Sequence, residues 1–364
     1  MSINCGIVGL PNVGKSTLFN AMTAAHVPAE KYPFCTKDHN TGMVAVPDDR
    51  LARIAEIFKP DKVVPTQVEF VDIAGLVQGA HKGEGLGNRF LSHIREMHAI
   101  AHVVRCFDAP DVAHSFDSID PVHDIEVVNT ELALADLDIV SKRTAKLEHL
   151  AKTGGKEAKA ELPALAKLKQ AIEKGSPARK AALTEKEWEL VDTTGLITTK
   201  PVLYVLNVNE SDVKAPSGRV EAALRFAEEE GSPAIEICGS IEDELADLTD
   251  DEKQEFLEDL GLEEAGLPRL IHAAYKLLDL ITFFTKDGPE VRAWTVRRGT
   301  TAPSAAGKIH TDFEKNFIRA EVYSYDELMK VGDEHRIKEA GHLRTEGHDY
   351  VIKDGDIVHF RSGK

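Results

Sequence analysis

Residues 9–17 read GLPNVGKST and place glycines, a lysine and hydroxyl side chains at a spacing typical of phosphate binding. They match G-x-x-x-x-G-K-[ST], with an apolar run before them and an amphipathic helical pattern after them. The glycines let backbone N–H groups curl around a diphosphate, and the dipole of the following helix favours its negative charge. Lys15 would reach the β- and γ-phosphates, and the Ser16 hydroxyl would bind Mg²⁺. The alternative is a chance Gly-rich turn; the setting favours a nucleotide site formed by Asn12, Val13, Gly14, Lys15, Ser16 and Thr17.

A second motif lies at the end of an apolar strand pattern over 67–73. Asp72 is near the end of this pattern, and Gly75 follows it by three residues. A carboxylate at the carboxyl edge of the sheet would lie beside Mg²⁺, and the Gly75 N–H would meet the γ-phosphate. Thr36 lies between the two motifs in a loop, where it is either a third Mg²⁺ ligand or a turn threonine. The predicted metal ligands are Ser16, Thr36 and Asp72.

The stretch after Asp72 is dense in glycine, at Gly79, Gly83, Gly85 and Gly87. Such density favours a loop that reorders around a γ-phosphate, with a plain surface loop as the alternative. His81 lies in this stretch and is either a catalytic group or an exposed polar residue. The predicted catalytic residues are Lys15, Thr36, Gly75 and His81.

The predicted base-binding residues follow a later apolar strand pattern, at Asn207-Val208-Asn209-Glu210. A guanine-reading GTPase has Asn-Lys-x-Asp here, and its Asp accepts hydrogens from guanine N1 and N2. Adenine presents the reverse pattern, an N1 acceptor and an N6 donor. A replaced lysine and a longer carboxylate weaken guanine selection, because a polar mismatch at a buried base edge is costly. Asn207, Val208 and Glu210 are the predicted base contacts, and they favour ATP over GTP.

Around these motifs, strand patterns at 4–8, 42–46, 67–73, 102–107, 201–207 and 234–238 alternate with helical patterns such as 48–58 and 86–100. The alternation predicts an α/β fold with a mostly parallel sheet and helices on both faces. Apolar helical stripes over 125–152 and 162–172, joined by Thr153-Gly154-Gly155, predict an inserted helical hairpin. A helix over 269–280 precedes a β-rich segment of about 80 residues, which indicates a separate small domain.

Charge, apolar runs and cysteine spacing indicate which partners and which cellular compartment to expect. The chain carries a net charge of −17, yet residues 141–186 hold 12 Lys and Arg against 5 Asp and Glu, a local net of +7. No run of 18 apolar residues exists and the first residues lack signal-peptide features, so we expect no membrane span. The four cysteines are scattered without metal-ligand spacing, as in a reducing, cytoplasmic compartment.

Taken with these motifs, the chain resembles the Obg-like ATPases, also called the YchF family, over nearly its whole length. The marks are GLPNVGKST, YPFCT, DIAGLVQGAHKGEGLGN, VNTELALADLD, NVNE, and RAW followed by AAGKIHTDFEKNFIRAE. The resemblance implies a P-loop NTPase (G) domain over 1–124 and 200–281, an inserted helical domain over 125–199, and a β-grasp-like TGS domain over 282–364. It also implies ATP hydrolysis in preference to GTP, and association with ribosomes.

Two residues gain a meaning from this resemblance. Leu76 stands where Ras-like enzymes place the glutamine that orients water, and an aliphatic side chain cannot orient water. Asn12 matches the asparagine that related GTPases use to hold K⁺ near the phosphates. Three rivals to a Mg²⁺-dependent ATPase stay open: an Obg-type GTPase, a nucleotide sensor with incidental turnover, and an RNA-binding module with a vestigial P-loop, which the intact Lys15, Ser16 and Asp72 oppose.

The basic hairpin is the predicted contact with the ribosome. We expect its cations to bind ribosomal RNA phosphates, with a solvated helical face as the alternative. The residues singled out are Lys142, Arg143, Lys146, Lys156, Lys159, Arg179 and Lys180.

Overall fold

A computed structural model describes residues 3–24, 41–73, 75, 79, 86–109, 112, 116, 118–191, 195–246 and 248–363. By their contacts, the residues form two compact units. The first comprises Met1–Gly42 and Glu69–Leu270, and the second comprises Met43–Val68 and Ile271–Lys364. Within the described ranges, none of the helices combines the length and apolar character needed to cross a lipid bilayer.

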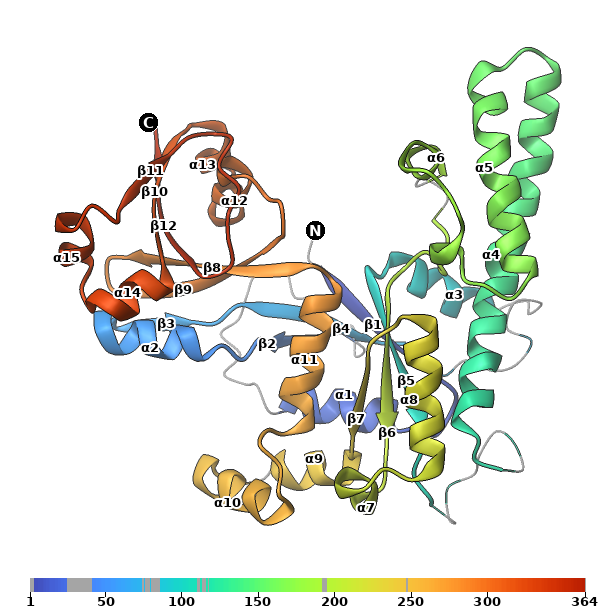
Figure 1. Cartoon of the computed structure of the whole chain (residues 1–364), viewed down its shortest axis with the longest axis horizontal. Helices are drawn as coiled ribbons and strands as arrows, with labels where there is room; N and C mark the ends of the chain where they lie inside the picture. Colours follow the sequence, from blue (N-terminus) through green and yellow to red (C-terminus); the bar gives the residue numbers. More distant parts are fainter. Residues whose placement is uncertain are drawn as a thin grey trace. The chain divides into compact units, whose positions relative to one another are not determined.

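The first sheet has the strand order β2-β4-β1-β5-β6-β7 (Figure 1). The pairings β4–β1, β1–β5, β5–β6 and β6–β7 are all parallel. Because β1 lies between β4 and β5, the chain leaves it toward one side and later returns on the other, which opens a crevice at its carboxyl end. The strands are β1 (Asn4–Val8), β2 (Thr41–Ala45), β4 (Gln67–Asp72), β5 (Ala99–Arg105), β6 (Val202–Asn207) and β7 (Ala234–Ile237).

Helices connect these strands or follow the last of them, as expected for parallel neighbours. They are α1 (Lys15–Ala24), α3 (Leu86–Glu96), α7 (Glu210–Lys214), α8 (Gly218–Glu230), α9 (Gly239–Ala246), α10 (Asp250–Leu260) and α11 (Gly266–Leu277). The parallel strands and their helices match the α/β architecture predicted from the alternating pattern.

The predicted hairpin is present as two long antiparallel helices, α4 (Pro121–Lys152) and α5 (Lys156–Glu173), which project from the sheet (Figure 1). Asp120 caps α4 by accepting from the His123 N–H, and Pro121 occupies its first turn. The turn between the helices uses Gly154 at φ 99°, a left-handed conformation that suits glycine. Leu147, Leu165 and Leu168 form the apolar seam. A short 3₁₀ turn (Ala178–Lys180) and α6 (Glu185–Val191) complete the insert.

The second unit is built on a mixed sheet with the order β11-β10-β12-β8-β9-β3. Its strands are β3 (Lys62–Val64), β8 (Leu280–Asp287), β9 (Glu290–Arg297), β10 (Phe317–Ser324), β11 (Arg344–Glu346) and β12 (Asp356–Ser362). Its helices are α2 (Asp49–Phe58), α12 (Ala302–Ile309), α13 (Thr311–Lys315), α14 (Tyr325–Val331) and α15 (Glu334–Glu339). Phe283, Phe284 and Tyr323 are fully buried in its core.

Three local elements differ from the sequence predictions. The helix predicted over 269–280 spans Gly266–Leu277, so Leu280 already begins β8, and β5 begins at Ala99 inside the predicted helix 86–100. The β-rich run expected at 349–351, in the C-terminal segment, forms only an isolated bridge between Val351 and Thr301. A short apolar run fits a buried strand and a buried helix equally well, so periodicity alone misplaced these boundaries.

Residues 43–68 also differ from the expected division, because this segment packs with the C-terminal residues. β3 pairs in parallel with β9, and Leu51 and Ile54 of α2 join the core around Phe284. Arg50 donates to both Asp48 and Asp354 at 2.8 Å. The division into three domains therefore stays a prediction at its boundaries.

Candidate nucleotide-binding site

The phosphate-binding loop begins where β1 ends, at the crevice of the first sheet. Its two framing glycines have no room for a side chain: a Cβ at Gly9 would lie 2.4 Å from the Val103 carbonyl oxygen, and one at Gly14 would lie 2.2 Å from Asn207 Nδ2. Gly14 also has φ 97°, in the left-handed region. The loop is thus pressed against β5 and β6, which fixes the direction of its N–H groups.

Lys15 is the buried cation of this loop, with 7% of its surface exposed. Its Nζ donates to the Leu10 carbonyl oxygen at 2.7 Å. Burial lowers the Lys15 pKa to about 8, and the nearby Asp72 carboxylate opposes that shift. A phosphate beside the ammonium would favour its charged form in the same way. Lys15 therefore lies where the loop can present one desolvated positive charge.

Gly75 lies against the same ammonium. A Cβ added at Gly75 would be 3.3 Å from Lys15 Nζ and 3.2 Å from the Pro11 backbone nitrogen. A Cβ here would be in unusually tight contact, so the P-loop backbone would have to move by a few tenths of an ångström to admit one. The structure therefore brings the D-x-x-G glycine and the P-loop lysine together, as the spacing predicted.

Ser16 and Asp72 meet across 56 residues of chain, with Ser16 Oγ donating to Asp72 Oδ2 at 3.1 Å. Asp72 Oδ1 is buried and accepts no hydrogen bond from a described residue. A buried carboxylate oxygen without a donor needs a cation or an ordered water. A hydroxyl and a carboxylate also form the all-oxygen donor set that Mg²⁺ prefers. These two residues therefore fit a magnesium ion.

The expected base-binding segment lies at the end of β6. Asn207 is 5% exposed, and its Nδ2 donates to the Val13 carbonyl oxygen at 3.0 Å while its Oδ1 accepts from the Gly239 N–H at 3.1 Å. Val208 is buried, and its N–H donates to the Ile237 carbonyl oxygen at 2.9 Å. Glu210 is exposed at the first turn of α7. Asn207 thus joins the P-loop to the base-side loops, whereas Glu210 is free to turn toward a base.

Sequence comparison identifies relatives that match this chain over nearly all of its length. A Haemophilus ducreyi protein named "Ribosome-binding ATPase YchF" is 53% identical over 361 residues, which cover 99% of each chain. A Bacillus subtilis protein of the same name is 52% identical over 363 residues, again 99% of each chain. The chain belongs to the YchF family.

The structural comparison agrees with this assignment. The Schizosaccharomyces pombe YchF GTPase has a TM-score of 0.90 and 37% identity, covering 99% of this chain and 98% of that one. A family model described as "50S ribosome-binding GTPase" matches residues 4–141. Another, named for the C-terminal part of YchF GTPases and described as "Protein of unknown function", matches residues 280–363. The α/β P-loop G domain predicted from the sequence is therefore confirmed.

Several predicted site residues of this YchF chain are not placed beside the others. Thr36 and His81, and also Leu76, lie outside the described residues. Asn12 and Thr17 are exposed on the P-loop and the start of α1. Asn12 has φ 60°, which is tolerated better by asparagine than by most residues. The roles of these residues stay predictions.

Sequence reasoning missed Arg105, a buried residue that shapes the loop after β5. It is 1% exposed, and its guanidinium donates to the carbonyl oxygens of Phe107, Ala109 and Val112 at 3.1–3.3 Å. In the loop that it organises, the Asp108 N–H donates to Asn209 Oδ1 at 3.1 Å, next to the base-side segment. The available signal was an arginine within an otherwise apolar strand pattern.

Two buried acids of α4 were missed in the same way. Asp136 is fully buried and accepts from the Ile197 and Thr198 N–H groups at 2.8 and 2.7 Å, so it holds the chain that leads into β6. Glu131 is 4% exposed and accepts from the Gly79 N–H. Both lie in the VNTELALADLD segment, where an acid on the apolar side of a helical stripe was the signal.

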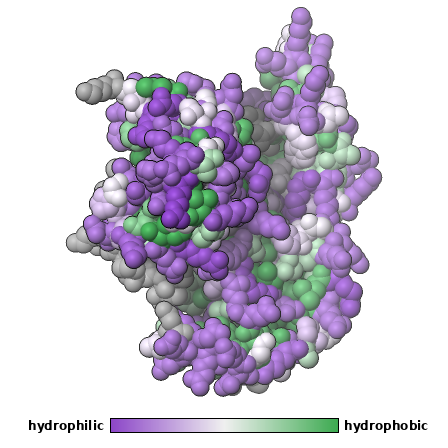
Figure 2. Space-filling view, turned by 60° about the vertical axis from the view of Figure 1, so that its left-hand side comes forward, coloured by the Kyte–Doolittle hydropathy of each residue, from purple (hydrophilic) through white to green (hydrophobic). Residues whose placement is uncertain are grey.

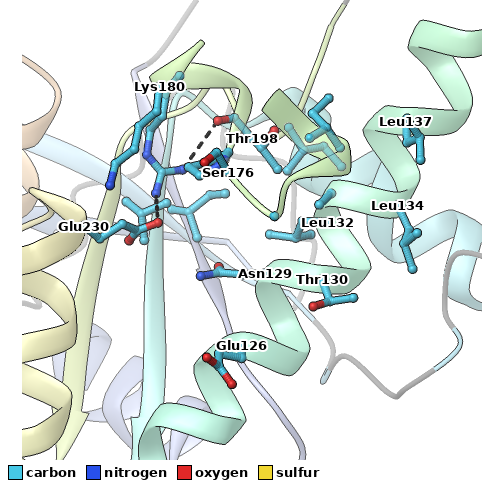
Figure 3. A pocket seen from close by; sticks show the side chains of 18 of the residues that line it. Glu126, Asn129, Thr130, Leu132, Leu134, Leu137, Ser176, Lys180, Thr198 and Glu230 are labelled. Atoms are coloured by element: carbon cyan, nitrogen blue, oxygen red, sulfur yellow. Dashed lines mark hydrogen bonds and ion pairs between the residues drawn. The ribbon is translucent and has the colours of Figure 1, made fainter. Parts of the chain in front are cut away.

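A cavity of about 750 Å³ lies at the base of the hairpin, between α4, residues 173–180 and α8 (Figure 3). Arg179 and Glu230 form an ion pair there at 2.7 Å, with side chains only 18% and 10% exposed. Glu230 also accepts from the Tyr204 hydroxyl at 2.5 Å, and Asn129 Nδ2 donates to that hydroxyl at 3.2 Å. Arg179, one of the expected RNA contacts, is thus engaged inside the protein.

Proposed function

We propose that this YchF chain is a Mg²⁺-dependent ATPase that acts as a nucleotide-dependent switch and binds the ribosome. The carrying observation is the juxtaposition of Lys15, Gly75, Ser16 and Asp72 at the end of β1. The relatives named "Ribosome-binding ATPase YchF", at 50–53% identity over 99% of this chain, support the choice of nucleotide and of partner.

The reaction joins a water oxygen to the γ-phosphorus and breaks the bond from that phosphorus to the β–γ bridging oxygen, which gives ADP and phosphate. Lys15 would exchange its bond to the Leu10 carbonyl for the β- and γ-phosphates and stabilise the charge that develops there. The Gly75 N–H would donate to the γ-phosphate. Ser16 and Asp72, with Thr36 as a third predicted ligand, would hold Mg²⁺, which neutralises phosphate charge when bound.

Two residues of the base-binding segment, Val208 and Glu210, support ATP rather than GTP as the substrate. Val208 is buried, and its backbone N–H donates to the Ile237 carbonyl oxygen. A buried apolar side chain therefore stands where the guanine-reading pattern has lysine. Glu210 is exposed and one methylene longer than the aspartate that pairs with guanine N1 and N2. We expect the free carboxylate to leave room for the adenine edge.

The deciding measurement is the dissociation constant of ATP and of GTP under equal Mg²⁺. We expect tighter binding of ATP, and a shift toward GTP in the Val208→Lys, Glu210→Asp double variant. Because Val208 is buried, Glu210→Asp alone serves as a second variant whose fold is not at risk, with the exposed Glu221→Asp of α8 as a matched control. Tighter binding of GTP by the unaltered chain would favour the Obg-type GTPase instead.

The exposed lysines of the hairpin support a ribosomal partner. A ribosomal partner in turn implies a cytoplasmic location. Lys146, Lys152, Lys156 and Lys159 are exposed near its tip and form no ion pair with a described residue. Figure 2 shows the tip, at the top of the view, as largely hydrophilic. Ammonium groups in water attract RNA phosphates by releasing their counterions. Arg143 pairs with Glu161 and Lys142 with Asp138, so the tip lysines are the preferred RNA contacts.

A further inference from the structure

One buried side chain of α4 contacts the chain that follows the D-x-x-G glycine. Glu131 of α4 is 4% exposed, and its Oε1 accepts a hydrogen bond of 2.7 Å from the Gly79 N–H, 52 residues away in the chain. Gly79 follows Gly75 by four residues. We propose that Glu131 is a positioning residue for hydrolysis, which holds the Gly79 backbone in place four residues after Gly75, the predicted γ-phosphate contact. This inference rests on the proposed ATPase activity.

The hydrogen bond between the Gly79 N–H and the Glu131 carboxylate is of a strong kind. A buried carboxylate is costly unless hydrogen-bond donors compensate for its lost hydration. A hydrogen bond to a charged acceptor is shorter and about twice as strong as a neutral one. The Glu131 carboxylate therefore binds the Gly79 N–H more strongly than a neutral acceptor would.

The conformation of Gly79 fits this role. Its φ is 86°, in the left-handed region, yet no atom of a described residue lies within 4 Å of where a Cβ would be. The glycine is thus required for the backbone direction and not for space. That direction is the one that presents its N–H to Glu131.

Gly75 and Gly79 therefore contact different elements. Gly75 lies against Lys15 and Pro11 of the P-loop, and Gly79 is bonded to α4. Only three residues separate them in the sequence, so the distance they span is at most about 14 Å. Loss of the Glu131 bond releases the Gly79 backbone while Lys15, Ser16 and Asp72 stay in place. We therefore expect turnover to fall without a loss of nucleotide affinity.

The test uses the full chain with Glu131→Gln, which keeps the size and an acceptor oxygen but removes the charge, and with Glu131→Ala. Two matched controls lie on the same helix. Glu126→Gln removes an exposed charge, and Asp136→Asn removes a buried acid that binds a different segment. The readouts are kcat for ATP, the dissociation constant of a non-hydrolysable ATP analogue, and Tm.

We expect Glu131→Gln to lower kcat about fivefold and Glu131→Ala to lower it further, with analogue affinity within about twofold. Both controls should keep kcat, although Asp136→Asn should lower Tm. An unchanged kcat in folded Glu131→Gln overturns the inference, and so does an equal fall in kcat and analogue affinity. If Glu131→Ala does not fold, Glu131→Gln decides alone. If the unaltered chain hydrolyses no ATP, the proposed function fails, and not this role of Glu131.

Discussion

The nucleotide corner, made of Lys15, Ser16, Asp72 and Gly75, and the hairpin tip, made of Lys146, Lys152, Lys156 and Lys159, use charge in opposite ways. Lys15 is 7% exposed, and burial lowers its pKa to about 8. The tip lysines are exposed to water. A desolvated charge acts strongly over a few ångströms, whereas an exposed charge acts weakly, through counterions, and is screened by salt. The difference suits the corner to chemistry and the tip to docking.

One helix connects the two regions. In α4 the buried residues, including Asp124, Glu131 and Asp136, are concentrated between Pro121 and Val140, and beyond Val140 only Leu147 is buried. The first part of the helix carries the buried carboxylates, among them Glu131, which bonds to Gly79. The second part carries Lys146 and Lys152, two of the four tip lysines. Separate substitutions at its two ends should therefore separate hydrolysis from ribosome binding.

The largest expected effect is at the corner. Lys15→Ala removes the buried cation of the phosphate-binding loop, and we expect kcat to fall on the order of 10³-fold. Ser16→Ala, which removes a predicted Mg²⁺ ligand, should also abolish Mg²⁺-dependent turnover. Phosphate release at saturating ATP measures both, with Lys146→Ala as the control that keeps its rate. Turnover near the unaltered level in the Lys15 and Ser16 variants would remove the assignment of the site.

The corner was predictable from sequence because its chemistry depends on short-range spacing. Gly14, Lys15 and Ser16 are consecutive, and Asp72 ends an apolar strand whose neighbour is β1. Parallel pairing then brings both motifs to the same edge of the sheet. The hairpin was predictable for a similar reason, since its apolar stripes and Gly-containing turn are local.

Long-range partners were not predictable in this way. No local pattern shows that Glu131 bonds to Gly79 or that Arg179 pairs with Glu230. The strand β3 is only three residues long and exists because β9 supplies its hydrogen bonds. A basic residue count likewise cannot separate the engaged Arg179 from the exposed Lys156, because their difference arises in the folded chain.

The second prediction tests the tip. Reversing Lys146, Lys152, Lys156 and Lys159 to Glu should weaken ribosome binding on the order of 10- to 100-fold near physiological salt and lower the slope of log Kd against log salt by about 3. Hydrolysis by the free chain should change less than twofold, because the corner is untouched. Co-sedimentation with ribosomes over a salt series measures the effect. Lys→Arg at the same four positions preserves the charge and is the matched control. An unchanged binding curve for the Glu variant would show that these lysines do not contact the ribosome.

The smallest expected effect is that of replacing Na⁺ by K⁺ at constant ionic strength, which should change turnover but not ribosome binding. At constant ionic strength, K⁺ and Na⁺ screen the tip lysines alike, so ribosome binding should not depend on which is present. If Asn12 helps to hold K⁺ beside the phosphates, turnover should be about fivefold faster in K⁺ than in Na⁺, because a fixed cation stabilises the developing charge. Asn12→Ala should erase this difference. Because Asn12 has φ 60°, Asn12→Gly removes the side chain without backbone strain and keeps the test free of misfolding. Equal rates in the two salts for the unaltered chain would refute the potassium site, and K⁺ stimulation that survives in Asn12→Gly would assign it to other groups.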